Sequence, residues 1–195
     1  MKILIAVTGG IAAYKAPSII SGLKSATKGI NFMERSGGCI YEVRVEVEVM
    51  QTENSKNFVT EASLSNVANA YHEMFWTEPV HISSTDNLDM FVIVPATANI
   101  IGKIANGICD DLVTNTAMAL SNDVIKTVCP ALNTRMWENI AFQRNLKVLK
   151  NDGWKIIDPI EGKMACGTTG MGKLASTRKL VEGIMDIYHT VKGVK

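Results

Sequence analysis

The feature that most constrains this chain is the alternation of short, mainly apolar runs with segments of helical apolar spacing. The first run covers residues 3–7 and ends at Thr8-Gly9-Gly10, and three more runs follow at residues 90–94, 124–129 and 154–157. Short apolar runs of this kind are typical of strands that are buried on both faces of a parallel sheet. Strands that alternate with helices predict an α/β fold: a doubly wound, Rossmann-like parallel sheet with helices on both faces.

Helical spacing follows each of these runs. Pro17 lies inside the first helical segment and should kink or delay it. A stretch rich in glycine and polar residues, 158–173, predicts a loop before the last helix. The segments with helical spacing are residues 12–23, 99–105, 112–120, 137–150 and 180–191.

Residues 41–49 (YEVRVEVEV) differ from the other strands because valines alternate strictly with charged residues. This pattern is typical of a strand with one wet face, so it predicts a sheet edge or a protruding hairpin. The turn-forming residues Ser36-Gly37-Gly38 precede it and favour the hairpin.

The composition suits one globular domain. Apolar residues make up 47% of the 195 residues and charged residues 20%, while 20 basic residues against 19 acidic ones leave a formal charge of +1. This balance gives no reason to expect nucleic acid or an anionic membrane as a partner. The longest apolar runs are shorter than a membrane span, and the four cysteines are too scattered for a zinc site. We therefore expect a cytoplasmic protein that uses no metal.

Three small-residue motifs follow strands and could bind a ligand. Backbone N–H groups at Thr8-Gly9-Gly10 suit a phosphate or a flavin edge, although the turn lacks the dinucleotide fingerprint. At residues 95–99, Asn99 either faces a ligand or, more simply, caps the next helix. At residues 130–137, Asn133 could donate its amide to a carboxylate or cap a helix, and Met136 could be ordinary core.

A fourth motif, residues 165–172 (ACGTTGMG), lies in the predicted loop. Glycine-rich loops of this length often close over a ligand, so Cys166 could act there as an acid or a nucleophile. The alternative is a flexible loop with an incidental thiol. His81 lies in a polar stretch, where an isolated histidine is more often a surface residue than a catalytic one.

Taken together, these segments resemble the homo-oligomeric flavin-containing cysteine decarboxylases, most closely the members that act on 4′-phosphopantothenoylcysteine. The resemblance covers nearly the whole chain apart from about residues 25–50. Its carriers are VTGGIAAYK, TENSKNF, the His81-Ile82 pair, PATANIIGKIANGICDDL, PALNTRMW and ACGTTGMGKL. We expect one flavoprotein domain over residues 1–195, with a surface insertion around 25–40 and a substrate lid around 158–174.

The resemblance implies FMN as the cofactor. The residues that fall on the family's flavin-binding positions are Gly9, Gly10, Ile11, Thr52, Asn54, Ser55, Phe58, Thr97, Ala98, Asn99, Ile100 and Ala131.

The resemblance also implies decarboxylation of 4′-phosphopantothenoylcysteine to 4′-phosphopantetheine, a step of coenzyme A biosynthesis. In this family the flavin takes up the electrons of the substrate thiol and later returns them. His81 matches the histidine that assists oxidation, Asn133 the asparagine that holds the substrate carboxylate, and Cys166 the proton donor. Met136 and Ala165 complete the expected substrate site.

The family implies self-association as a trimer or a dodecamer, with each flavin at a subunit interface. Two other functions remain open at this stage: decarboxylation of peptidyl-cysteine in lantibiotic maturation, and flavin binding by a non-catalytic regulator. The intact ACGTTGMGKL segment favours the coenzyme A precursor, and the presence of His81, Asn133 and Cys166 together favours an enzyme.

Overall fold

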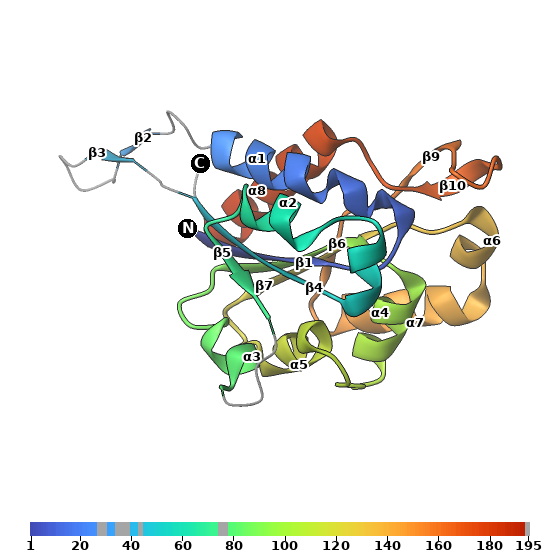
Figure 1. The fold of residues 1–195 in the computed structure, drawn as a ribbon, viewed down its shortest axis with the longest axis horizontal. Helices are drawn as coiled ribbons and strands as arrows, with labels where there is room; N and C mark the ends of the chain where they lie inside the picture. The colour runs from blue at the N-terminus through green and yellow to red at the C-terminus, as the bar shows by residue number, and fades with distance from the viewer. Residues whose placement is uncertain (27–30, 34–39, 43–44, 74–77, 194–195) are drawn as a thin grey trace.

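A six-stranded parallel sheet forms the centre of the protein (Figure 1). The computed structural model describes residues 1–26, 31–33, 40–42, 45–73 and 78–193. The strand order is β5-β4-β1-β6-β7-β8, so the direction of winding reverses between β1 and β6. This order confirms the predicted Rossmann-like fold. The strands are β1 Lys2–Val7, β4 Glu46–Gln51, β5 Ala70–His72, β6 Met90–Ala96, β7 Ile125–Pro130 and β8 Lys155–Ile156.

Helices cover both faces of the sheet (Figure 1). Helices α1 (Ala16–Ala26) and α8 (Thr177–Lys192) pack together on one face. The other face carries α3 (Val80–Ser83), α4 (Ala98–Ala105), α5 (Leu112–Ala119) and α7 (Ile140–Asn151). Short elements complete the connections: η1 Ile11–Lys15, η2 Glu53–Asn57, α2 Glu61–Ser65 and α6 Thr134–Trp137.

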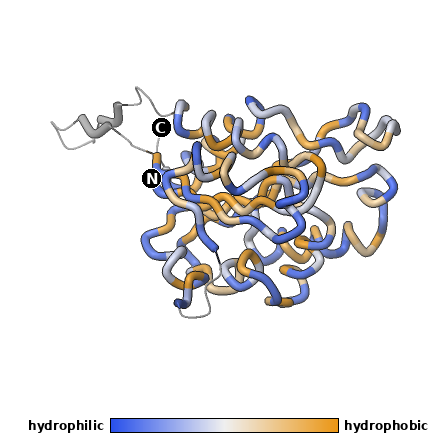
Figure 2. The backbone as a smooth tube through the Cα atoms, in the orientation of Figure 1, coloured by the Kyte–Doolittle hydropathy of each residue, from blue (hydrophilic) through white to orange (hydrophobic). Residues whose placement is uncertain are grey.

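The core has two layers because successive side chains of a strand point to opposite faces. In β1, Ile3, Ile5 and Val7 pack toward α1 and α8, whereas Leu4 and Ala6 pack toward the helices of the other face. All seven residues of β6 are buried. Figure 2 shows the hydrophobic residues gathered along these central strands. Within the described part of the chain, none of the helices has the length and apolarity needed to cross a membrane.

The first helix confirms the effect expected of Pro17. The segment after the Gly10 turn starts as the 3-10 helix η1, and the α-helix proper begins only at Ala16. Proline is tolerated in the first turn of a helix, where its missing N–H has no partner to lose.

The prediction of a sheet edge or hairpin for residues 41–49 is confirmed at Tyr41 and Glu42, which belong to an antiparallel strand pair, and is wrong from Glu46 onward. Strand β4 begins at Glu46 and pairs in parallel with both β1 and β5, so it lies inside the sheet. Its polar face is covered because the Glu48 carboxylate lies 3.3 Å from Lys2 Nζ and 2.7 Å from His72 Nε2. Partners on neighbouring strands thus make a charged position compatible with an interior strand.

Two antiparallel hairpins lie outside the main sheet. Strands β2 (Asn31–Met33) and β3 (Ile40–Glu42) pair with each other, and most of the predicted insertion around 25–40 lies outside the described residues. Strands β9 (Ile160–Lys163) and β10 (Thr169–Lys173) form the second hairpin. The loop predicted for residues 158–173 is therefore wrong in part, because its polar, glycine-rich sequence contains a paired ribbon.

Candidate functional site

The site is built where the winding direction reverses, at the carboxyl ends of β1 and β6. In open α/β sheets the chain diverges at this point and leaves a crevice for ligands. Thr8, which follows β1, is buried and donates its hydroxyl hydrogen to the Pro95 carbonyl at 2.7 Å. The same oxygen accepts from the Thr97 backbone N–H at 3.1 Å. These two bonds hold the ends of β1 and β6 side by side.

A first cavity of about 580 Å³ opens at these strand ends. It brings together most of the residues expected to bind flavin, although they come from four separate segments. Gly9 is required here by space, because a Cβ on this residue would lie 2.5 Å from Asn54 Cβ. The residues that line the cavity are Thr8, Gly9, Thr52, Glu53, Asn54, Thr97, Ala98, Asn99, Ile100, Lys103, Asp111, Ala131, Leu132 and Met136.

Asn99 is not the helix cap that the simpler interpretation predicts. Helix α4 is capped by Thr97, whose Oγ1 accepts from the Ile100 N–H at 3.3 Å. Asn99 lies in the first turn of α4, is exposed, and lines the first cavity. Met136, for which a core position was the simpler interpretation, is 48% exposed and lines the same cavity.

A second cavity of about 700 Å³ adjoins the first, and Ala131 and Leu132 line both. It lies between the turn after β1, the start of α6 and the β9–β10 hairpin. The lining residues are Gly10, Ile11, Ala12, Tyr14, Lys15, Ala131, Leu132, Asn133, Lys163, Met164, Ala165, Cys166, Gly172, Lys173 and Leu174. The residues expected to contact the substrate through the lid, Ala165 and Cys166, therefore face the same space as Asn133.

Asn133 has the capping role that the sequence left open, and its amide N–H₂ group donates to side chains of the hairpin. Its Oδ1 accepts from the Arg135 N–H at 2.9 Å and caps α6. Its Nδ2 donates to Cys166 Sγ at 2.9 Å and to Thr168 Oγ1 at 3.3 Å. Because the cap fixes which end of the amide is the acceptor, the N–H₂ group is left to point toward the hairpin as a donor.

Cys166 is exposed at the tip of the hairpin, beside Thr168 and Asn133. Hydrogen bonds from the Thr168 hydroxyl and backbone N–H, followed by the one from Asn133, hold the pKa of the Cys166 thiol below its ordinary value. The donors come from the hairpin itself and from Asn133, which lies 33 positions away in the sequence.

The hairpin is seated on the start of α6 by close backbone contacts. The Leu132 N–H donates to the Gly172 carbonyl at 3.0 Å, and the Thr134 hydroxyl donates to the Met171 carbonyl at 2.8 Å. Gly172 has φ of +125°, and a Cβ on it would overlap the Leu132 carbonyl oxygen. Glycine at this position thus allows the contact that places Cys166 near Asn133.

Three predicted site residues lie apart from both cavities. Ser55 is fully buried and its hydroxyl bonds Gln51 Oε1 and the Thr52 carbonyl, while Phe58 is 42% exposed beyond η2. His81 is half-buried on α3. Figure 1 places α3 at the opposite end of the molecule from α6 and the β9–β10 hairpin, so His81 does not meet Asn133 within one chain.

The sequence interpretation gave no role to Lys103 in the first cavity or to Lys15 in the second. Lys103 lines the first cavity and lies 2.6 Å from Asp110 Oδ1 and 3.3 Å from Asp111 Oδ2. Lysines also line the second cavity: Lys15, Lys163 and Lys173. Lys15 lies four residues after Ile11, which is one helical turn from the glycine motif. This spacing could have indicated that Lys15 faces the same cavity as the motif.

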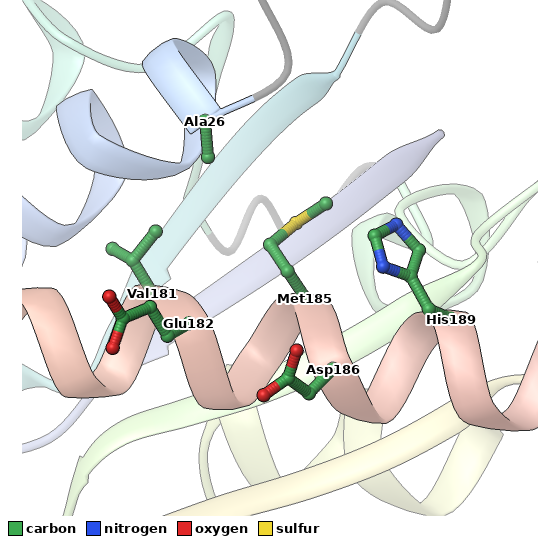
Figure 3. A pocket seen from close by; sticks show the side chains of 6 residues that line it. All are labelled: Ala26, Val181, Glu182, Met185, Asp186 and His189. Carbon is green, nitrogen blue, oxygen red and sulfur yellow. The ribbon is translucent and has the colours of Figure 1, made fainter. Parts of the chain in front are cut away.

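A further hollow of about 400 Å³ lies far from these motifs, between the end of α1 and one face of α8 (Figure 3). Its wall carries two carboxylates, Glu182 and Asp186, and none of the predicted site residues. Most of the predicted site residues therefore line the two strand-end cavities, and this hollow contains none of them.

Comparison with known proteins finds relatives that match nearly the whole chain. A bifunctional coenzyme A biosynthesis protein, CoaBC, of Bacillus subtilis is 36% identical over 187 residues, covering 93% of this chain and 41% of the relative. A probable phosphopantothenoylcysteine decarboxylase of Streptococcus mutans is 32% identical over 94% of this chain and 96% of its own length. The chain thus spans less than half of the bifunctional relative and nearly all of the shorter one.

Two solved structures share the fold over almost the whole chain. One is a PPC decarboxylase mutant complexed with pantothenoylaminoethenethiol, with a TM-score of 0.80, 27% identity, and coverage of 96% of this chain and 98% of that one. The other is the FMN-binding protein AtHal3, with a TM-score of 0.74, 27% identity and 97% coverage of both chains.

The fold and its paired strand-end cavities define an α/β protein of the nucleotide-binding class. Within that class the chain belongs to the Flavoprotein family, whose family model matches residues 1–189.

Proposed function

We propose that this protein is an FMN-dependent decarboxylase that converts 4′-phosphopantothenoylcysteine to 4′-phosphopantetheine in coenzyme A biosynthesis. The observation that carries the proposal is the junction of Asn133 with Cys166 on the wall of a ligand-sized cavity that adjoins the flavin-binding motifs. The names of its relatives support the same substrate. We further propose that it acts in the cytoplasm.

The first cavity fits the flavin. Thr52 Oγ1 is buried and has no hydrogen-bond partner among the described residues, which leaves it available to a bound group. Gly9 keeps the cavity open at Asn54. Thr52, Asn54 and the start of α4 would hold FMN from this side, and the turn at Gly10 and Ile11 would hold it from the second cavity. FMN supplies two-electron redox chemistry when bound.

In the proposed reaction Asn133 Nδ2 donates a hydrogen bond to the substrate carboxylate and fixes its orientation. A neutral donor serves this purpose without the full positive charge that would stabilise the carboxylate and oppose its departure. The Cys166 thiol then gives its proton to the carbon that has lost CO₂. A thiol pKa displaced toward neutrality makes it a stronger acid for that step, provided that it remains protonated.

His81 acts in this proposal across a subunit interface. Since α3 lies at the opposite end of the chain from Asn133, a second copy must supply the histidine if both serve one flavin. This separation supports a closed, symmetric assembly, for which we propose a trimer or a dodecamer built from trimers.

Release of CO₂ tests the reaction directly. The purified chain is loaded with FMN and supplied with 4′-phosphopantothenoylcysteine, and CO₂ and 4′-phosphopantetheine are measured together. We expect equal amounts of both, with little turnover of a peptide that ends in cysteine. Preferred turnover of the peptide would assign the protein to peptidyl-cysteine decarboxylation, and FMN binding without CO₂ would assign it to non-catalytic flavin proteins.

Co-expression of two inactive chains tests the shared site. His81→Asn and Asn133→Asp chains should each be inactive alone, and their mixed assemblies should regain about a quarter of the sites if copies combine at random. A mixture that stays inactive although mass measurement shows mixed assemblies would contradict the interface role of His81.

A further inference from the structure

Ser55 falls on a position expected to bind flavin, yet it is fully buried and lines neither cavity. Its backbone N–H donates to the Thr52 carbonyl at 3.0 Å, and its hydroxyl lies 2.6 Å from the same oxygen. The hydroxyl also lies 3.1 Å from Gln51 Oε1, so its single hydrogen is shared between two acceptors. Ser55 therefore holds the last residue of β4 and the first residue after it from the protein interior.

The side-chain amide of Gln51 extends this network to the edge of the sheet. Gln51 is buried, and its Nε2 donates to the Tyr71 hydroxyl at 2.8 Å. Tyr71 lies on β5, the edge strand that pairs with β4 (Figure 1). Buried amides are stable when both polar atoms have partners. The bonds to Ser55 and Tyr71 meet this condition and fix the orientation of the Gln51 side chain.

Thr52 is left with one polar group for a ligand. Its backbone N–H donates to the Val7 carbonyl at 3.0 Å, and its own carbonyl is held by both polar groups of Ser55. Its Oγ1 is buried without a hydrogen-bond partner among the described residues, and Thr52 lines the first cavity. A buried hydroxyl without a partner lowers stability unless a ligand supplies one. The protein thus fixes the backbone of Thr52, and the side chain remains available to the group that fills the cavity.

A fixed backbone is enough to direct this hydroxyl. Threonine is branched at Cβ, so few rotamers are open to it once its backbone is held. Gly9 confines the same turn, because a Cβ on the glycine would lie 2.5 Å from Asn54 Cβ. Close packing at Gly9 and hydrogen bonds from Ser55 together leave Thr52 little freedom.

We propose that Ser55, Gln51 and Tyr71 are positioning residues that direct the Thr52 hydroxyl toward bound FMN. Ser55 acts through Thr52 and does not touch the flavin itself, which replaces the direct contact expected from the sequence. The inference rests on the proposed function for the identity of the cofactor. A hydroxyl that is oriented before the ligand arrives loses little rotamer freedom on binding, so the network should increase FMN affinity.

A double-mutant cycle on FMN affinity tests the network. Holoenzyme of the wild type, Thr52→Val, Ser55→Ala and the double variant is diluted, and the fluorescence of released flavin gives each Kd. We expect Thr52→Val to weaken FMN roughly tenfold and Ser55→Ala roughly fivefold, within the range of one hydrogen bond. In the Thr52→Val background, Ser55→Ala should cause no further loss, because the hydroxyl through which it acts is gone.

Two further variants separate orientation of the hydroxyl from general loosening of the turn. Thr52→Ser keeps the hydroxyl, so the effect of Ser55→Ala should reappear in that background. Thr127→Val is the matched control. Thr127 is fully buried on β7, lines neither cavity, and its hydroxyl has no partner among the described residues. This control should leave FMN affinity unchanged.

Tyr71→Phe keeps the inference testable if Ser55→Ala does not fold. It removes only the last hydroxyl of the network, on a residue that is part-exposed at the sheet edge. We expect FMN to bind roughly threefold more weakly, since one neutral hydrogen bond is lost at a distance from the flavin. This loss should also vanish in the Thr52→Val background.

The outcomes separate the network from the proposed reaction. Losses that add in the double variants would show that Ser55 and Tyr71 only stabilise the turn. That result, or unchanged FMN affinity in Ser55→Ala, would overturn the positioning role and leave the proposed function standing. The expected pattern of FMN affinities in a protein that releases no CO₂ from 4′-phosphopantothenoylcysteine would overturn the function and retain the positioning role.

Discussion

The two cavities share a wall at Ala131 and Leu132, but they differ in whether their charged side chains are paired. In the first cavity, Lys103 is neutralised by Asp110 and Asp111, and the wall presents hydroxyl groups and small residues. In the second, Lys15, Lys163 and Lys173 form no ion pair with any residue that the structure describes, and they lie in the same cavity as the Cys166 thiol. A wall whose charged groups are paired within the protein suits a resident group that does not leave. An uncompensated positive wall suits an anionic substrate that enters and departs at each turnover.

Replacement of Asn133 by aspartate should give the largest effect and should act on the second cavity alone. Aspartate can still cap α6, but it cannot donate to the substrate carboxylate, and its charge repels that group in a partly desolvated cavity. We expect turnover to fall at least roughly a hundredfold, since like charges placed together cost several kcal/mol. Flavin absorbance should be unchanged.

Asn139→Asp is the matched control, because Asn139 caps α7 in the same manner through an Oδ1 bond to the Ala141 N–H at 2.9 Å. It should retain normal turnover. If the Asn133 variant lost its flavin, the two cavities would not be separable, and the comparison between them would fail.

Cys166→Ser should divide the reaction into its two halves. Serine keeps the shape of the side chain but is a far weaker acid, so CO₂ should leave once per site and protonation of the product should stall. The flavin should bleach on addition of substrate, and mass spectrometry should find a product two hydrogens lighter than 4′-phosphopantetheine. Slow but complete turnover would mean that Cys166 only packs within the hairpin.

Gly9→Ala should act on the first cavity instead. The new Cβ would lie 2.5 Å from Asn54 Cβ and 2.9 Å from the Asn54 carbonyl carbon, so the turn after β4 must shift. Overpacking of this kind costs about 1–3 kcal/mol, which corresponds to roughly a ten- to hundredfold loss of FMN affinity. Flavin titration measures the loss, and Gly102→Ala, inside α4, is the control. Unaltered affinity would show that Gly9 does not shape the flavin site.

The fold could be predicted because apolar runs and turn glycines are local signals. The site motifs each follow a strand, and parallel strands bring their carboxyl ends to one edge of the sheet, so most of these residues meet at the two cavities. The position of β4 could not be predicted from its own sequence, because Glu48 is covered by Lys2 and His72 from other segments. The meeting of Lys15 with Lys163 and Lys173 at the second cavity was missed for the same reason, because it exists only after the hairpin folds back toward η1.

The smallest effect is expected at Thr168, and it concerns the pH dependence of turnover. Thr168 Oγ1 lies 3.0 Å from Cys166 Sγ and is the main cause of the lowered thiol pKa. If the thiol acts as an acid, turnover is lost as the pH rises through that pKa. The hydrogen bond therefore places the loss at lower pH than an ordinary cysteine would.

Thr168→Val removes the hydroxyl donor, so the pKa of Cys166 should rise and the alkaline fall of kcat should move to higher pH. Activity on the acid side of this fall should change little, because the thiol is protonated below its pKa and Asn133 still holds the substrate. Thr169→Val, at the adjacent exposed position, should leave the profile in place. A profile that moves to lower pH, or does not move, would mean that another group controls the alkaline limb. Cys166 would then not be the acid, although its place beside Asn133 would be unchanged.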